Sequence, residues 1–237
     1  SDYEMLESLY ENKKEGSSLC LFNVTMQNHS SYDDTDYTFE NPVKLTSMTL
    51  QPEAEQYLSL IKMSDDALKE LITYFEKIKE PVIIVLFGDH QPHLPDYFYK
   101  NVMGEMPDDL SQKDAMKRYQ VPFMIWANYD IQAAEISQIS INYLSTLMTE
   151  TAGLKLTDYQ KFLLDMYQYI PSITANGFYD RQGNLYSWDD LDEADAELQE
   201  WIKEYRILQY NYLFDEEHRK DAHYQLKEKM IWGKKET

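Results

Sequence analysis

The sequence predicts an α/β fold in which a mostly parallel sheet is flanked by helices. Short apolar runs alternate along the chain with longer amphipathic segments, the order that strand–helix–strand folds require. The run at 82–87 (VIIVLF) contains no polar residue, which is typical of a strand buried on both faces of a parallel sheet. Hydrophobic residues make up 43% of the 237 positions, which is enough for a substantial core.

The first part of the chain is expected to contain two helices and a strand. Residues 2–14 and 52–79 carry apolar side chains at three- and four-residue steps, which predicts helices. The run at 19–25 (LCLFNVT) is predicted to be a mostly buried strand, with Cys20 as an inert buried thiol. Residues 26–41 show no period and are expected to form a loop.

Two more strands and a helix are expected further along the chain. The apolar run at 82–87 is the second predicted strand, and the run at 121–127 (VPFMIWA) is the third. The charged stretch at 96–119 between them has no clear period and is predicted to be irregular. A helix is predicted over 133–151, followed by Gly153 as an end signal.

The last third of the chain is expected to be mostly helical. Helices are predicted over 157–170 and 191–214 from their apolar spacing. Between them, Asn176-Gly177 and the segment 182–184 (QGN) are turn signals beside aromatic and apolar residues. This pattern predicts a small hairpin.

The predicted elements divide the chain into two parts. Residues 1–155 are expected to form the sheet-containing part, and residues 156–237 a helical extension with the small hairpin, packed on the same domain. No apolar run approaches the roughly 20 residues that span a bilayer. Because the chain opens without Met, we expect it to be a piece of a longer protein whose membrane or targeting segments lie upstream.

The composition excludes several classes of function. The chain has 22 Lys and Arg residues against 42 Asp and Glu residues, a formal net charge of −20. A surface this acidic repels phosphate backbones, so nucleic acid is not an expected partner. The single cysteine, Cys20, excludes an intrachain disulfide and a cysteine-based zinc site. The sequence also contains no P-loop, no G-x-S-x-G elbow and no H-E-x-x-H motif.

The segment Gly88-Asp89-His90 is the first candidate site. It follows the strand predicted at 82–87, and ligand sites in open α/β sheets form at the carboxyl ends of strands. A carboxylate beside an imidazole suits Mn²⁺, Zn²⁺ or a similar divalent ion, and glycine permits a sharp turn. The structural alternative is an aspartate that caps the next turn, with a hydrogen-bonded histidine beside it.

Histidines supply the other candidates. His29 follows the strand predicted at 19–25, so in a parallel sheet it would converge with Asp89 and His90 on one edge. The alternative is a loop histidine in water. His93 could be a further ligand or a substrate contact, although a surface loop histidine is the simpler interpretation. The histidines of the charged tail, His218 and His223, are expected to be solvated.

Several of these segments, in this order, resemble the lipoteichoic acid synthase-like sulfatase family of the alkaline phosphatase superfamily. The resemblance covers most of residues 1–214. The segments that carry it are 23–32 (NVTMQNHSSY), 57–62 (YLSLIK) with Ser64-Asp65, 87–92 (FGDHQP), 121–126 (VPFMIW), 162–165 (FLLD) and 205–211 (YRILQYN). The implied fold is the C-terminal half of an alkaline-phosphatase/sulfatase-like domain with a helical C-terminal extension.

The resemblance implies roles for three residues. Asp89 and His90 match the metal pair of the family, and His29 matches a histidine that contacts the substrate's phosphate or leaving group. The implied metal is most often Mn²⁺, with Mg²⁺, Zn²⁺ or Ca²⁺ as alternatives. The family's threonine nucleophile and its metal-binding glutamate lie upstream of the segments that match here, so this chain alone is expected to be inactive. His93 has no family role to transfer.

The implied activity is the transfer of phosphoglycerol at the outer face of a bacterial plasma membrane. The implied partners are a phosphatidylglycerol-like lipid head group or another phosphate or sulfate ester, and the missing N-terminal half of the same protein. Upstream transmembrane helices would anchor the whole protein. Two alternatives remain open, a sulfatase- or phosphatase-like hydrolase and a non-catalytic cell-envelope module that binds through the acidic surface and residues 189–212.

Overall fold

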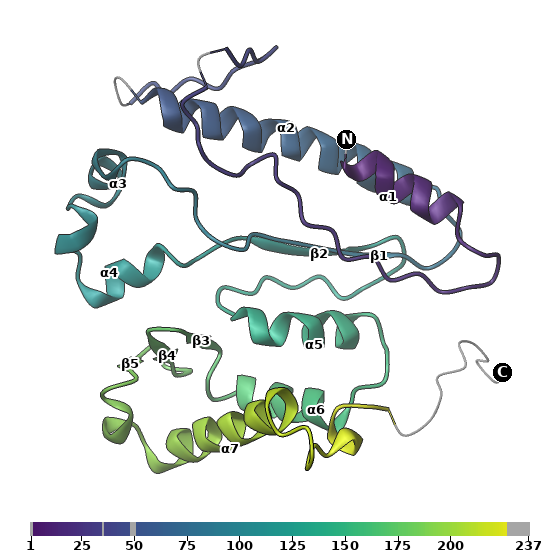
Figure 1. Cartoon of the computed structure of the whole chain (residues 1–237), viewed down its shortest axis with the longest axis vertical. Coiled ribbons are helices and arrows are strands. Elements are labelled where there is room, and N and C mark those ends of the chain that lie inside the picture. The colour runs from purple at the N-terminus through teal and green to yellow at the C-terminus, as the bar shows by residue number, and fades with distance from the viewer. Residues whose placement is uncertain (1, 35, 48–50, 227–237) are drawn as a thin grey trace. The chain divides into compact units, whose positions relative to one another are not determined.

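The computed structural model in Figure 1 describes residues 2–34, 36–47 and 51–226. It confirms a mixed α/β fold built from helices and two small sheets. The chain divides into two compact units, residues 1–129 and residues 130–237. No helix within the described residues is both long and apolar enough to cross a membrane.

Two helices of the first unit pack side by side (Figure 1). Helix α1 spans Asp2–Glu11 and helix α2 spans Pro52–Phe75, with the proline in its first turn, where a missing N–H costs nothing. The ring of Tyr10 on α1 meets the ring of Phe75 on α2 edge to face, with centroids 5.5 Å apart. Both predicted helices are therefore confirmed, although α2 ends before Lys79 in a turn in which the N–H of Ile78 donates to the carbonyl of Phe75.

The sheet of the first unit is antiparallel, so the prediction of a mostly parallel sheet is wrong for the described strands. Strand β1 spans Ile83–Phe87 and pairs with β2, which spans Phe123–Ala127. Their register places Ile83 opposite Ala127 and Phe87 opposite Phe123. The prediction that β1 is buried on both faces is also wrong, because its residues are only partly buried and Leu86 is 38% exposed. An apolar run is compatible with either direction of pairing, so the composition of β1 could not reveal it.

The excursion, residues 88–122, connects β1 to β2. The sequence predicts irregular structure over 96–119, but the structure contains helix α3 (Asp96–Met103), the 3₁₀ turn η1 (Pro107–Asp109) and helix α4 (Gln112–Lys117). Gly104 ends α3 with φ +91°, a conformation that favours glycine, and Ser111 caps α4 by accepting from the N–H of Asp114 at 3.1 Å. These helices are too short to show a period in the sequence.

The predicted strand at 19–25 is also wrong. Its residues form an exposed coil rather than a buried strand, and Phe22 is 79% exposed. Cys20 is likewise exposed, so the buried thiol is a wrong prediction. The β-forming side chains of this run do not make a strand because a strand also needs a neighbour to receive its backbone hydrogen bonds, and the described residues supply none here.

Three helices enclose the core of the second unit. They are α5 (Ile141–Thr151), α6 (Asp158–Tyr167) and α7 (Ala196–Leu213), and short 3₁₀ turns η2 (Leu191–Glu193) and η3 (Asp221–His223) flank α7. The fully buried side chains of this core are Tyr143, Leu163, Met166, Ile170, Phe178 and Ile202. All three helices were predicted, but α5 begins at Ile141 instead of Ala133 and α7 begins after η2.

A three-stranded antiparallel sheet completes the second unit. Strands β3 (Ser172–Thr174), β4 (Gly177–Tyr179) and β5 (Leu185–Ser187) pair in that order, which confirms the predicted hairpin and adds one strand to it. The buried carboxylate of Asp180 fixes the β4–β5 turn, because it accepts from the backbone N–H and from the side-chain amide of Asn184, each at 2.8 Å.

Candidate active site

The candidate site begins where β1 ends and the chain turns sharply. The N–H of Gly88 donates to the carbonyl of Pro122 at 3.1 Å, which extends the β1–β2 ladder by one bond. A Cβ atom at Gly88 would lie 2.9 Å from the Cβ of Val121, closer than real Cβ contacts. Only glycine therefore lets the chain pass Val121 at this point and carry Asp89 to the surface.

Asp89 and His90 form a compact pair. The Oδ1 of Asp89 accepts from the backbone N–H of His90 at 2.9 Å, and the Oδ2 faces the Nε2 of His90 at 3.6 Å. The Nδ1 of His90 lies 2.8 Å from the carbonyl oxygen of Gln91. Since a carbonyl oxygen only accepts, Nδ1 carries the hydrogen and the lone pair of Nε2 points outward beside the carboxylate. The two side chains are 76% and 62% exposed, so both are accessible to a ligand.

His29 lies beside this pair. Its ring meets the ring of His90 edge to face, with centroids 6.3 Å apart. The Nδ1 of His29 donates to the carbonyl of Ser30 at 2.8 Å, so its Nε2 is also left free. The structure thus brings together the three residues that the sequence singles out. Their convergence needs no parallel strands, because the loop that holds His29 follows a coil.

Contacts from buried groups hold the loop of His29 in place. The hydroxyl of Tyr32 donates to the carbonyl of Asn28 at 2.7 Å, and the hydroxyl of Ser64 on α2 donates to the side chain of Asn28 at 3.1 Å. Tyr32 is only 5% exposed, and burial raises its pKa to about 12. The phenol therefore stays protonated and keeps donating over the whole neutral range, which fixes the position of the neighbouring His29.

The donor set of the pair fits part of a metal site. In a tetrahedral site with bonds of about 2.1 Å, two ligand atoms lie about 3.4 Å apart, close to the 3.6 Å between Asp89 Oδ2 and His90 Nε2. Carboxylate oxygen and imidazole nitrogen suit Zn²⁺ and Mn²⁺. In the part of the chain that the structure describes, no group of three His, Cys, Asp or Glu side chains is placed to hold a metal ion. The pair therefore supplies two ligands of a site that needs further ones.

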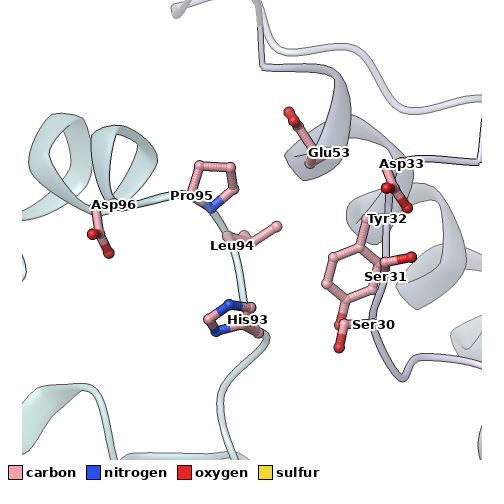
Figure 2. Close-up of a pocket in the computed structure, with 9 residues that line it drawn as sticks. All are labelled: Ser30, Ser31, Tyr32, Asp33, Glu53, His93, Leu94, Pro95 and Asp96. Atoms are coloured by element: carbon pink, nitrogen blue, oxygen red, sulfur yellow. The ribbon is translucent and has the colours of Figure 1, made fainter.

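A pocket of about 370 Å³ adjoins these residues along the chain (Figure 2). Its walls come from the segment after His29, from the segment after His90 and from the first turn of α2. The lining residues are Ser30, Ser31, Tyr32, Asp33, Glu53, His93, Leu94, Pro95 and Asp96. His93 is exposed and belongs to the wall of this pocket. The roles of His93, of the metal pair and of His29 stay predictions.

The sequence did not reveal the three carboxylates of this pocket. Asp33, Glu53 and Asp96 come from separate segments, and no spacing pattern links them. Glu53 is held by the hydroxyl of Tyr97, which donates to its Oε2 at 3.2 Å. The pocket offers many hydrogen-bond acceptors and repels anions, so it suits hydroxyl groups better than phosphate.

The histidines of the second unit lie among charged surface residues. The Nδ1 of His218 is 3.0 Å from Asp215 Oδ1, an exposed contact that lowers the pKa of the aspartate through their hydrogen bond. The ring of His223 lies against the ring of Tyr224, with centroids 6.2 Å apart. These contacts hold the segment after α7 and create no cluster of possible metal ligands within the described residues.

Two curated proteins are similar to this chain in sequence. A Rhizobium meliloti (strain 1021) protein named for cyclic beta-1,2-glucan modification is 28% identical over 203 residues, which are 82% of this chain and 31% of that protein. The capsular polysaccharide biosynthesis protein RkpI of the same organism is 33% identical over 88 residues, 37% of this chain and 14% of that protein. The chain thus spans less than a third of the length of these curated relatives.

A solved structure has the same fold. The Streptococcus pyogenes phosphoglycerol transferase GacH, in complex with sn-glycerol-1-phosphate, superposes with a TM-score of 0.63 at 17% sequence identity, over 89% of this chain and 48% of that one. This likeness shows that the two chains share a fold. The sulfatase family profile matches residues 1–154, which include His29, Asp89 and His90. The chain therefore belongs to the sulfatase family.

Proposed function

We propose that this chain is part of a metal-dependent phosphoglycerol transferase that acts on phosphate esters. The observation that carries the proposal is the assembly of His29, Asp89 and His90 beyond the end of β1, with a free imidazole nitrogen on each histidine. Membership of the sulfatase family supports it, and GacH, which shares the fold, is a phosphoglycerol transferase.

Each residue of the site has its own proposed role. Asp89 Oδ2 and His90 Nε2 would hold the divalent ion, with Mn²⁺ as the expected metal. When bound, such an ion neutralises charge on a phosphoryl group and lowers the pKa of a hydroxyl nucleophile. The Nε2 of His29, when protonated, donates a hydrogen bond to a phosphoryl oxygen or a proton to the leaving oxygen. The carboxylates of the pocket in Figure 2 accept hydrogen bonds from the hydroxyls of the transferred polyol.

The remaining parts of the machinery belong to the proposed whole protein. We propose that a threonine nucleophile and a further metal-binding glutamate precede this chain, which spans 31% of one curated relative and 48% of the GacH chain. The whole protein would act at the outer face of a bacterial plasma membrane, anchored by upstream helices. Residues 1–237 alone are expected to show no turnover.

The test uses the full-length protein and the substitution Asp89→Asn. We expect the loss of bound Mn²⁺ and a fall in transfer of phosphoglycerol by about a hundredfold or more, because the carboxylate is a proposed ligand. Asp192→Asn in the second unit, an exposed aspartate, is the matched control and should change neither value. If Asp89→Asn keeps both the metal and the activity, the assignment of the site is wrong.

The family match also favours a second candidate, a hydrolase that releases the ester group to water. The same protein should be assayed with a phosphoglycerol donor, with and without a glycan acceptor. A transferase forms a phosphoglycerol-substituted product that depends on the acceptor. A hydrolase releases free glycerol phosphate at the same rate with and without the acceptor.

A further inference from the structure

A second pocket, of about 540 Å³, lies within the second unit. The first turn of α5 contributes Ile141 and Asn142. One face of α7 contributes Ile202, Tyr205, Arg206 and Gln209. Trp188, just after β5, closes the wall between them. The pocket is built from regular elements that pack on the buried core of the unit, so its walls are fixed by that core.

The charge of this pocket is opposite to that of the chain. None of its lining residues is acidic, although 42 of the 237 residues are Asp or Glu. Its one charged lining residue is Arg206, whose guanidinium lies over the ring of Trp188 at 4.9 Å from the centroid. No carboxylate among the described residues lies within ion-pair distance of it. An arginine stacked on an aromatic face keeps its N–H donors free at the edge of the plane, where an oxyanion can bind.

The aromatic ring under this arginine is fixed. The Nε1 of Trp188 donates to the carbonyl of Thr174 at 3.1 Å, and the Trp188 ring packs on the buried ring of Phe178, with centroids 5.6 Å apart. The indole therefore serves as a rigid platform for the Arg206 side chain. A cation that is already held in place loses less entropy when it binds an anion.

Further donors converge on the same pocket. The N–H groups of Ile141 and Asn142, the first two residues of α5, have no partner within the helix, whereas the N–H of Tyr143 donates to the carbonyl of Ser140 at 3.1 Å. The side chain of Ser140 does not cap the helix, and no acidic residue occupies its first turn. The Nδ2 of Asn142 is buried and makes no hydrogen bond of acceptable geometry, although the amide lies near enough to Tyr205 to offset part of the rise in its pKa that burial causes. A helix N-terminus, a buried amide donor and a free guanidinium together complement an oxyanion.

We propose that this pocket binds a phosphate ester of a polyol or sugar, at a site separate from the one formed by His29, Asp89 and His90. Arg206 and the N-terminus of α5 would bind the phosphate, the amide of Gln209 would bind a hydroxyl, and Ile141 would contact the carbon skeleton. The shared chemistry is the phosphate ester, whether it is a free small molecule or a substituent of a polymer. The proposal rests on residues of the second unit alone and does not depend on the proposed catalytic function.

The experiment titrates the 237-residue chain with glycerol phosphate and follows the indole N–H signals by NMR. The Trp188 signal is identified by its loss in Trp188→Phe. We expect a saturable shift of this signal with glycerol phosphate, a weaker one with inorganic phosphate and none with glycerol. Arg206→Gln should weaken binding about tenfold or more, because a charge-assisted hydrogen bond is lost. Arg219→Gln, which removes an exposed arginine paired with Asp221, should leave the affinity unchanged.

A second variant guards against an indirect effect of Arg206 on the indole. Gln209→Glu places a carboxylate in the pocket with almost no change of shape, and should abolish the shift while the circular dichroism spectrum stays the same. Asp89→Asn should leave the shift unchanged, which separates this site from the proposed metal site. Equal affinity in the wild type, Arg206→Gln and Gln209→Glu, or the absence of any saturable shift, overturns the proposal. A phosphoglycerol-substituted glycan that binds more tightly than glycerol phosphate would identify the polymer as the source.

Discussion

His29 and His90 lie edge to face with 6.3 Å between their ring centroids, although the whole of helix α2 separates them in the sequence. Each ring donates from Nδ1 to the carbonyl of the residue that follows it, at 2.8 Å in both cases. The two imidazoles thus have the same tautomer and both expose Nε2. They differ in one respect, because among the residues that the structure describes only His90 has a carboxylate beside its free nitrogen.

This difference predicts separate effects for the two histidines. In the full-length protein, His29→Asn should lower kcat/KM by about 10²- to 10⁴-fold, the usual contribution of a general acid or base. It should leave the Mn²⁺ content unchanged, because Asp89 and His90 are the proposed ligands. Metal analysis and steady-state kinetics on the same preparation give both values. His218→Asn is the control, and loss of metal in His29→Asn would make His29 a ligand instead.

Gly88 should be required for the position of the metal pair. A Cβ atom there would lie 2.9 Å from the Cβ of Val121, so Gly88→Ala is expected to displace Asp89 and to weaken Mn²⁺ binding about tenfold. Isothermal titration with Mn²⁺ measures the change. Val121→Ala removes the Cγ atoms but keeps the Cβ that lies 2.9 Å away, so the double variant should recover little of the affinity. No loss in Gly88→Ala would show that the turn has room for a side chain.

A buried hydrogen bond should contribute to the stability of the second unit. The hydroxyl of Tyr143, which is only 1% exposed, donates to the carbonyl of Ile170 at 2.7 Å. Tyr143→Phe removes this donor and should lower the free energy of unfolding by about 1–2 kcal/mol. Urea unfolding followed by circular dichroism tests this. The exposed Tyr210 provides the control, since Tyr210→Phe should change the free energy of unfolding by less than about 0.5 kcal/mol.

Alkaline pH should destabilise the fold through its buried tyrosines. Burial raises the pKa of Tyr32 to about 12, and burial also raises the pKa of Tyr143. In the unfolded chain these phenols ionise near pH 10. The unfolded state therefore binds fewer protons than the folded state between pH 10 and 12, so stability is full below pH 10 and falls as the pH rises through this window. Urea midpoints at pH 8, 10 and 11 should decrease in that order, and Tyr32→Phe should show a smaller decrease than Tyr119→Phe.

Long periodic segments and continuous apolar runs could be predicted from the sequence. Helices α2, α6 and α7 show their apolar faces over many residues, and β1 and β2 are continuous apolar runs. The short helices α3 and α4 could not be predicted, because the capping by Gly104 and Ser111 defines them more than any period does. The antiparallel direction of the β1–β2 pairing could not be predicted from the sequence either, because it depends on how the chain between the two strands folds.

The candidate site could also be predicted from the sequence only in part. Asp89 and His90 could be found because they stand directly after a recognisable strand, and His29 because its segment resembles that of a known family. The reason given for their convergence was wrong, since the residues before His29 form a coil. The pocket acids Asp33, Glu53 and Asp96 meet only in three dimensions, so no local signal marks them.

The antiparallel pairing of β1 and β2 has a consequence for how this protein can change over evolution. The excursion leaves the sheet at Gly88, supplies four residues of the pocket wall, from His93 to Asp96, and returns at Pro122, where the same two residues close the ladder. Its length and composition can vary between its anchored ends without disturbing the register of the strands. Insertions and deletions within residues 91–120 can therefore change the lining of the pocket, while Asp89 and His90 keep their place beyond the end of β1.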